Sequence, residues 1–150
     1  MSGLRRQHVL PVTTDTDTGG YWQAATEERL ALCACRACGM TLHLPKGYCH
    51  HCGSWDVVWR SAGTTGTLYS WTVVRHSIHS AFPAPCTVIL VALDDDPTVR
   101  LVGNLQGEPP VYAGMPMQVW FEHVAPGVTL PQWQPVEIGR RDAASEMAPN

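Results

Sequence analysis

The chain has 150 residues and carries ten Lys and Arg against thirteen Asp and Glu, a formal net charge of −3. This length predicts one domain or two small modules, and the 45% share of hydrophobic residues is typical of a globular protein. The acidic balance argues against a dedicated nucleic-acid-binding protein. The longest apolar run, Val88–Leu93, is far shorter than the ~20 residues of a membrane-spanning helix. No apolar stretch follows the first six residues, so we expect no secretory signal and a cytoplasmic location.

Residues 1–32 are expected to form an arm and a helix. The first nineteen residues are polar and include a Thr- and Asp-rich loop. Between Gly20 and Leu32, large side chains recur at three- and four-residue steps, a spacing that indicates a helix.

Residues 33–60 contain four cysteines in two Cys-x-x-Cys pairs with ten residues between them: Cys35, Cys38, Cys49 and Cys52. A tight turn in each pair can place two thiolates on the same side of the chain, and a glycine follows each pair to allow a positive φ. This spacing is typical of a zinc ribbon. Four thiolates leave no open coordination position, so we expect a structural Zn²⁺ site and not a catalytic one.

The cysteines fit two other arrangements less well. A disulfide framework is disfavoured because nothing places the chain in an oxidising compartment, and a thioredoxin-like motif would need a βαβ pattern that is absent. Rubredoxin-type iron uses similar pairs, so spacing alone does not distinguish zinc from iron. Of the two remaining cysteines, Cys33 is expected to be a bystander and Cys86 a buried, inert thiol. His50 and His51 are expected to be exposed turn residues.

Residues 61–139 have the sequence pattern of a small β barrel. Five short segments rich in β-branched and aromatic residues alternate with turns: Thr67–Val74, Thr87–Leu93, Thr98–Leu105, Met117–His123 and Leu130–Ile138. This pattern predicts a five-stranded barrel of the OB type. The end of the chain, residues 140–150, is expected to be a flexible tail.

Several motifs extend these observations: Cys35-x-x-Cys38-Gly39, Cys49-x-x-Cys52-Gly53-Ser54, Gly66-x-Leu68-Tyr69-Ser70-Trp71-Thr72-Val73-Val74, Arg100-Leu101-Val102-Gly103-Asn104-Leu105 and Gly114-Met115-Pro116. In this order, over roughly residues 20–138, the chain resembles the zinc-ribbon/OB-fold acyl-CoA-associated family, catalogued as domain of unknown function thirty-five. The resemblance implies a mainly β protein with an N-terminal helix, a rubredoxin-like zinc ribbon and a five-stranded OB-fold barrel. It departs from the family at His50-His51, where a proline usually follows the first cysteine, and at Cys33, which is commonly polar.

The resemblance also implies a function. Members are accessory subunits of thiolase-like enzymes, including sterol-carrier-type thiolases and side-chain aldolases, and some associate with hot-dog-fold hydratases. The partner holds the catalytic residues and acts on acyl-CoA thioesters in lipid, sterol or aromatic-acid degradation. The ribbon/OB subunit stabilises the partner and in some assemblies helps to hold the CoA portion of the thioester.

The residues themselves agree with a non-catalytic chain, because no Ser/His/Asp arrangement, pair of carboxylates or Gly-rich phosphate loop is evident. Between Ser61 and Gly139 the permanent cations are Arg75 and Arg100 against six acids, a net charge of −4 (two minus six) that disfavours phosphate-backbone binding. We expect one of these two arginines to approach a CoA phosphate. The alternatives are a stand-alone acyl-CoA-binding module and, with less support, an OB protein that binds single-stranded nucleic acid.

Overall fold

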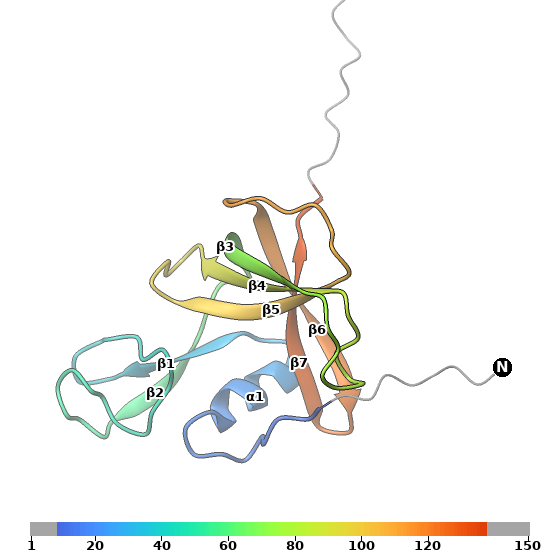
Figure 1. Cartoon of the computed structure of the whole chain (residues 1–150). Helices are drawn as coiled ribbons and strands as arrows, with labels where there is room; N and C mark the ends of the chain where they lie inside the picture. Colours follow the sequence, from blue (N-terminus) through green and yellow to red (C-terminus); the bar gives the residue numbers. More distant parts are fainter. Residues whose placement is uncertain (1–8, 138–150) are drawn as a thin grey trace, which may run out of the picture.

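The structure of the chain, a computed structural model, describes residues 9–137. This range contains one helix and seven strands, and the strands form two antiparallel sheets (Figure 1). The helix is α1 (Gly19–Thr26), and the strands are β1 (Ala31–Cys35), β2 (Val57–Ser61), β3 (Thr65–Val74), β4 (Cys86–Leu93), β5 (Arg100–Gln106), β6 (Pro116–Ala125) and β7 (Val128–Pro135). The mainly β architecture expected from the sequence is confirmed. The expected tail at 140–150 and the first eight residues of the arm lie outside the described residues.

The larger sheet has the strand order β5-β4-β3-β6-β7 and curls so that its two end strands meet. The meeting point is marked by Gly103 on β5, where a Cβ atom would lie 2.9 Å from Cδ1 of Trp133 on β7. A side chain at position 103 would therefore push the two strands apart. The interior of this barrel is filled by Leu30, Leu68, Ile89, Val91, Leu93, Val99, Leu101, Met117 and Trp133.

The smaller sheet pairs β1 with β2 in a register that runs from Ala31 opposite Ser61 to Cys35 opposite Val57. The segment between these strands contains both Cys-x-x-Cys turns, and Figure 1 shows it extending away from the barrel. Its own small core consists of Cys33, Cys35, Leu42 and Cys49, with Val57 and Trp59 packed against them. At the base, the Ala62 N–H donates to the Leu30 carbonyl at 2.8 Å, so the ribbon leaves and re-enters the barrel at one place.

The expected helix over residues 20–32 is wrong in its second half. Helix α1 ends at Thr26 because the next residues form a Schellman motif: the N–H groups of Glu28 and Arg29 donate to Ala25 and Ala24. Glu28 adopts a φ of 54°, which no α-helix can continue. The apolar residues that follow continue as strand β1, whose pairing with β2 overrides their helical spacing.

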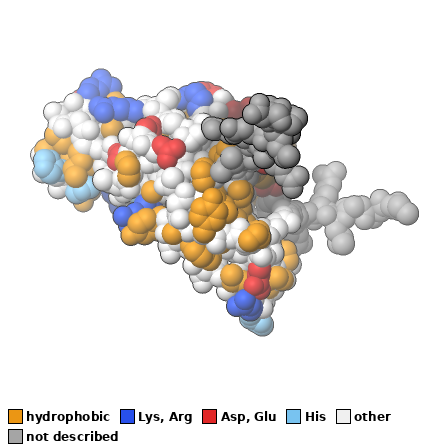
Figure 2. All heavy atoms as spheres, turned by 90° about the horizontal axis from the view of Figure 1, so that it is seen from above, with side chains coloured by type: hydrophobic (Ala, Val, Ile, Leu, Met, Phe, Trp, Pro, Cys, Tyr) orange, Lys and Arg blue, Asp and Glu red, His pale blue; other side chains and the backbone are white. Residues whose placement is uncertain are grey.

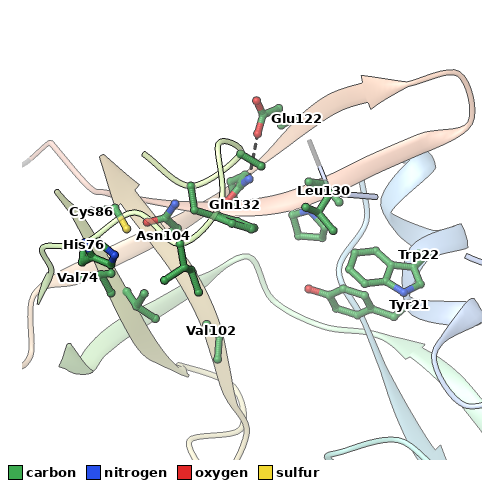
Figure 3. Close-up of a pocket in the computed structure, with 17 residues that line it drawn as sticks. Tyr21, Trp22, Val74, His76, Cys86, Val102, Asn104, Glu122, Leu130 and Gln132 are labelled. Atoms are coloured by element: carbon green, nitrogen blue, oxygen red, sulfur yellow. Dashed lines mark hydrogen bonds between the residues drawn. The ribbon is translucent and has the colours of Figure 1, made fainter. Parts of the chain in front are cut away.

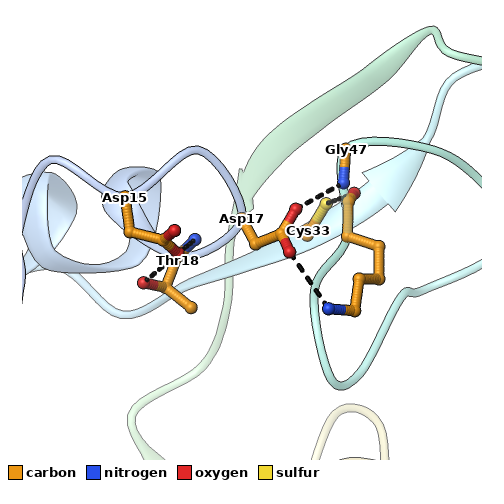
Figure 4. A network of polar contacts seen from close by, with 6 residues as sticks. Asp15, Asp17, Thr18, Cys33 and Gly47 are labelled. Carbon is orange, nitrogen blue, oxygen red and sulfur yellow. Dashed lines mark hydrogen bonds and ion pairs between the residues drawn. The ribbon is translucent and has the colours of Figure 1, made fainter.

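Helix α1 packs between the ribbon and the barrel, against β1 and β7 (Figure 1). A Cβ atom on Gly20 would lie only 2.1 Å from Nε1 of Trp59 on β2, so the absence of a side chain lets the helix approach the ribbon. The segment before the helix is also tied to the ribbon (Figure 4). The Asp17 carboxylate accepts hydrogen bonds from the Gly47 N–H at 2.9 Å and from Nζ of Lys46 at 3.0 Å. The Lys46 ammonium and the Gly47 N–H lower the pKa of Asp17.

Among residues 9–137, no helix has the length and apolar character needed to cross a membrane.

Candidate functional site

The four cysteines of the two Cys-x-x-Cys pairs converge at the tip of the ribbon. The Sγ atoms of Cys35, Cys38, Cys49 and Cys52 all lie within 4.8 Å of one another. The Cys35–Cys52 Sγ–Sγ distance is 3.6 Å and the Cys38–Cys49 distance is 3.7 Å. Four sulfurs about 2.3 Å from a central ion would be about 3.8 Å apart, so this arrangement fits a tetrahedral tetrathiolate site.

Two matching turns hold this arrangement. The Gly39 N–H donates to the Cys35 carbonyl and the Gly53 N–H donates to the Cys49 carbonyl, both at 2.8 Å. The two glycines have φ values of 77° and 76°, a region that disfavours residues with a Cβ atom. The first cysteine of each pair is buried and the second is exposed. The site therefore combines two ligand positions anchored in the ribbon core with two on its surface.

The pKa values of the clustered thiols are shifted in different directions: that of Cys35 is lowered, whereas those of Cys38 and Cys52 are raised, so without a metal the thiolate form is favoured at Cys35. The Cys38 N–H, hydrogen-bonded to the Cys35 sulfur, lowers the pKa of Cys35 to about 7. Because all four donors belong to the protein, the site leaves no position open for a substrate or a water molecule. Its chemistry is that of a structural metal, which would fix the positions of the two turns.

The other cysteines take no part in this cluster. The Cys33 thiol contacts the Lys46 carbonyl at 3.9 Å, and burial raises the pKa of Cys33, which keeps it protonated. Cys86 is buried at the start of β4. His50 and His51 are exposed in the second turn and are not among the clustered ligand atoms.

The two arginines expected near a CoA phosphate are not brought together. Arg100 begins β5, opposite Ala92, whereas Arg75 follows the end of β3 and makes a two-point ion pair with Glu108, just beyond the other end of β5. The seven residues of β5 span six steps of about 3.3 Å, so its two ends lie about 20 Å apart. The Arg100 guanidinium lies 3.8 Å from the centre of the Tyr69 ring, and no carboxylate in the described part of the chain pairs with it. A single phosphate can therefore meet one of these arginines but not both.

One polar connection was missed by the sequence analysis. His123 on β6 uses Nδ1 toward the Thr129 hydroxyl at 2.9 Å and Nε2 toward the Glu28 carboxylate at 3.1 Å. The carboxylate of Glu28, the imidazole of His123 and the hydroxyl of Thr129 are thus connected in the order of a catalytic triad. Thr129 is only 3% exposed, so a substrate does not reach its hydroxyl. We interpret the group as a structural link between the end of α1 and the β6–β7 hairpin. Glu28 lies 95 residues from His123 in the sequence, so no local pattern indicated the connection.

Comparisons with known proteins agree with this architecture. Residues 22–58 match the family model described as the ChsH2 rubredoxin-like zinc ribbon domain, and residues 59–122 match the ChsH2 C-terminal OB-fold domain. A curated relative, the "Probable enoyl-CoA hydratase alpha subunit" of Thermomonospora curvata, is 39% identical over 123 residues. The match covers 79% of this chain but 37% of the relative, so the chain spans little more than a third of that protein.

Solved structures extend the likeness to the whole fold. A chain of the structure described as "Ltp2-ChsH2(DUF35) aldolase" is 37% identical, with a TM-score of 0.74 and coverage of 83% of this chain and 98% of that one. A protein of unknown function from the DUF35 family of Sulfolobus solfataricus shares the fold, at 15% identity and a TM-score of 0.50 over 67% of this chain and 75% of that one. The zinc-ribbon match, together with the four clustered sulfurs, supports zinc as the structural metal. With a four-cysteine ribbon and an OB barrel that match these domains, the chain belongs to the ChsH2 family of DUF35 zinc-ribbon/OB-fold proteins.

Proposed function

We propose that this chain is a non-catalytic, zinc-containing accessory subunit of a thiolase-like or aldolase enzyme that acts on acyl-CoA thioesters. In this proposal the partner holds the reacting residues, and the ribbon and barrel support it. The observation that carries the proposal is the 98% coverage, at 37% identity, of a chain from the structure described as an Ltp2-ChsH2(DUF35) aldolase. The curated relative's description as an alpha subunit also supports a role within a larger assembly.

The surface composition supports a protein partner. Large hydrophobic side chains are exposed at several places, with Trp55 at 78%, Leu44 at 74% and Val12 at 70% of their maximum. Figure 2 shows hydrophobic side chains gathered across the middle of one face of the molecule. Exposed aromatic and aliphatic side chains with few charges are typical of the central part of a protein interface.

The CoA portion of the thioester gives a finer version of the proposal. Because Glu108 already neutralises Arg75, Arg100 is the better candidate for contact with a CoA phosphate in the assembled complex. Replacing Arg100 with Ala should weaken CoA binding to the complex about two- to fivefold, the effect expected of an exposed charge pair. Arg75→Ala is the matched control and should leave the affinity unchanged. Equal CoA affinities of both variants and the unmodified complex, measured by calorimetry, would remove Arg100 from this role.

The main proposal is tested by mild affinity purification of the chain from its native cells. Co-purifying proteins are identified by mass spectrometry, the mass of the assembly by light scattering, and zinc by atomic absorption. A stoichiometric thiolase-like or aldolase partner with one zinc per chain is expected. A chain that elutes alone with zinc and bound CoA would instead favour a stand-alone acyl-CoA-binding module. Salt-dependent binding of single-stranded DNA at low micromolar concentration would favour the nucleic-acid alternative.

A further inference from the structure

The barrel carries a cleft of about 490 Å³ that the accessory-subunit role does not use (Figure 3). Strands β4, β5 and β7 form its floor, and helix α1 and the loop between β3 and β4 form its walls. In the barrel, β4 and β5 are the second and third strands, and OB folds bind ligands on the face of these strands beside the loop that joins the first two. The cleft therefore lies where this fold is suited to hold a ligand.

The lining of the cleft is mainly apolar. Val88, Val102 and Leu130 contribute aliphatic surface from three strands, and Trp22 and Phe82 contribute aromatic surface from the two walls. Small-molecule sites in proteins have volumes of about 300–1,000 Å³ and are mostly apolar, with a few polar groups that orient the ligand. In size and composition the cleft meets this description.

Tyr21 supplies one of these polar groups. Its ring is held edge-on against Trp22, at a centroid distance of 5.0 Å and an interplanar angle of 84°. Figure 3 shows its hydroxyl pointing toward the middle of the cleft. No other residue of the 9–137 segment forms a hydrogen bond with this hydroxyl, and burial raises the pKa of Tyr21 to about 12. The hydroxyl is thus a neutral group in a half-buried side chain, and it can donate a hydrogen bond to an oxygen atom of a bound molecule.

The opposite end of the cleft holds a second polar group. The side chains of His76 and Asn104 both line the cleft, and Figure 3 shows them on the side away from Tyr21; neither side chain makes a hydrogen bond within residues 9–137. Gln132 lies between the two ends and donates to the Glu122 carboxylate at 2.9 Å. Apart from Glu122, the described residues that line the cleft include no carboxylate, lysine or arginine, so no charged group among them favours an anionic or phosphorylated ligand.

We propose that this cleft binds an uncharged, largely apolar molecule that carries a hydroxyl or carbonyl oxygen. Tyr21 donates a hydrogen bond to that oxygen. Asn104 and His76 form hydrogen bonds with a second polar group at the other end of the molecule. The apolar walls of α1 and of the β3–β4 loop cover the body of the molecule. This site belongs to the chain itself and needs no partner, so its test is independent of the accessory-subunit proposal.

The test uses the full zinc-loaded chain and Nile red, an uncharged, largely apolar dye with a ring carbonyl. Saturable binding of one dye per chain is expected from the rise in its emission. Tyr21→Phe removes the hydroxyl but keeps the ring and should weaken binding about two- to tenfold, the effect of one lost hydrogen bond. Val102→Trp fills the cleft from β5 and should abolish saturable binding.

Matched controls separate the cleft from the rest of the surface. Tyr112→Phe removes a hydroxyl from an exposed tyrosine outside the cleft, and Val12→Trp adds an indole at a valine as exposed as Val102. Both should bind the dye like the unmodified chain, and the zinc content of each variant reports that the ribbon is intact. Non-saturable binding, or equal losses in each variant and its control, would overturn the proposal. Binding that survives Val102→Trp would overturn it as well.

Discussion

The contact between helix α1 and the ribbon gives a quantitative prediction, because Gly20 has no room for a side chain. In Gly20→Ala the new methyl would lie 2.1 Å from Nε1 and 2.3 Å from Cδ1 of the Trp59 indole. Carbon contacts are favourable at about 3.5–4.0 Å, so the helix and the indole must separate by about 1.4 Å. Overpacking of this kind costs about 3 kcal/mol at the upper end of its range, and the better helix propensity of Ala offsets about 1 kcal/mol. The expected net loss of stability is about 2 kcal/mol.

Thermal unfolding of the zinc-saturated chain, followed by circular dichroism, measures this loss. For a chain of this size about 2 kcal/mol corresponds to a fall in Tm of about 6 °C. Gly47→Ala is the control, because its Cβ would lie 3.7 Å from Oδ1 of Asp17 and should leave the Tm unchanged or slightly raised. Trp59→Phe should reduce the loss caused by Gly20→Ala, which a double-mutant cycle would detect. A Gly20→Ala variant that melts at or above the unmodified chain would refute the claim that α1 packs directly on the ribbon.

Three further predictions concern the metal site, the end of α1 and barrel closure. Cys49→Ser should lose zinc and unfold the ribbon, whereas Cys33→Ser should keep one zinc per chain. The zinc content of the purified variants tests this prediction. Zinc retained by Cys49→Ser would contradict the tetrathiolate site. Glu28→Gly should raise stability by up to about 1 kcal/mol, because glycine adopts the positive φ without strain and the exposed ion pair that is lost contributes little. Glu28→Ala, which keeps the strain, should show no such gain in denaturant unfolding. Gly103→Ala should cost about 1–3 kcal/mol, since its methyl would meet Trp133 at 2.9 Å, and an unchanged unfolding midpoint would argue against β5–β7 closure at this point.

The elements with a strong local pattern could be predicted from the sequence. Segments rich in β-branched and aromatic residues between turn signals located the five barrel strands, although β7 begins at Val128 and ends at Pro135, earlier than expected. The spacing of Cys35, Cys38, Cys49 and Cys52 identified the residues whose sulfurs converge, because a Cys-x-x-Cys turn is a local structure. Their role as metal ligands and the domain limits at 33–60 and 61–139 stay predictions.

The elements that depend on distant contacts could not be predicted in this way. The first two residues of strand β1, Ala31 and Leu32, were assigned to the helix because Leu32 continues the spacing of α1, and only the pairing with β2 makes that segment extended. The cleft escaped notice because its polar groups come from residues as far apart as Tyr21 and Gln132. Arg75 and Arg100 were grouped by charge alone, and their separation follows from the register of β4 and β5.

The hydrogen bond between Ala62 and Leu30 has a consequence for the modular character of the molecule. The thirty-one residues from Ala31 to Ser61 form an excursion whose two ends are paired neighbours, Ala31 opposite Ser61. Because the two ends of this segment are adjacent, the segment is a closed loop. Its length therefore has little effect on the conformational entropy that is lost when the barrel closes. Insertions or deletions in the segment between β1 and β2 would change how far the ribbon extends from the barrel, and the order of the barrel strands would stay the same. The length of the ribbon can therefore change without a change in the fold of the barrel.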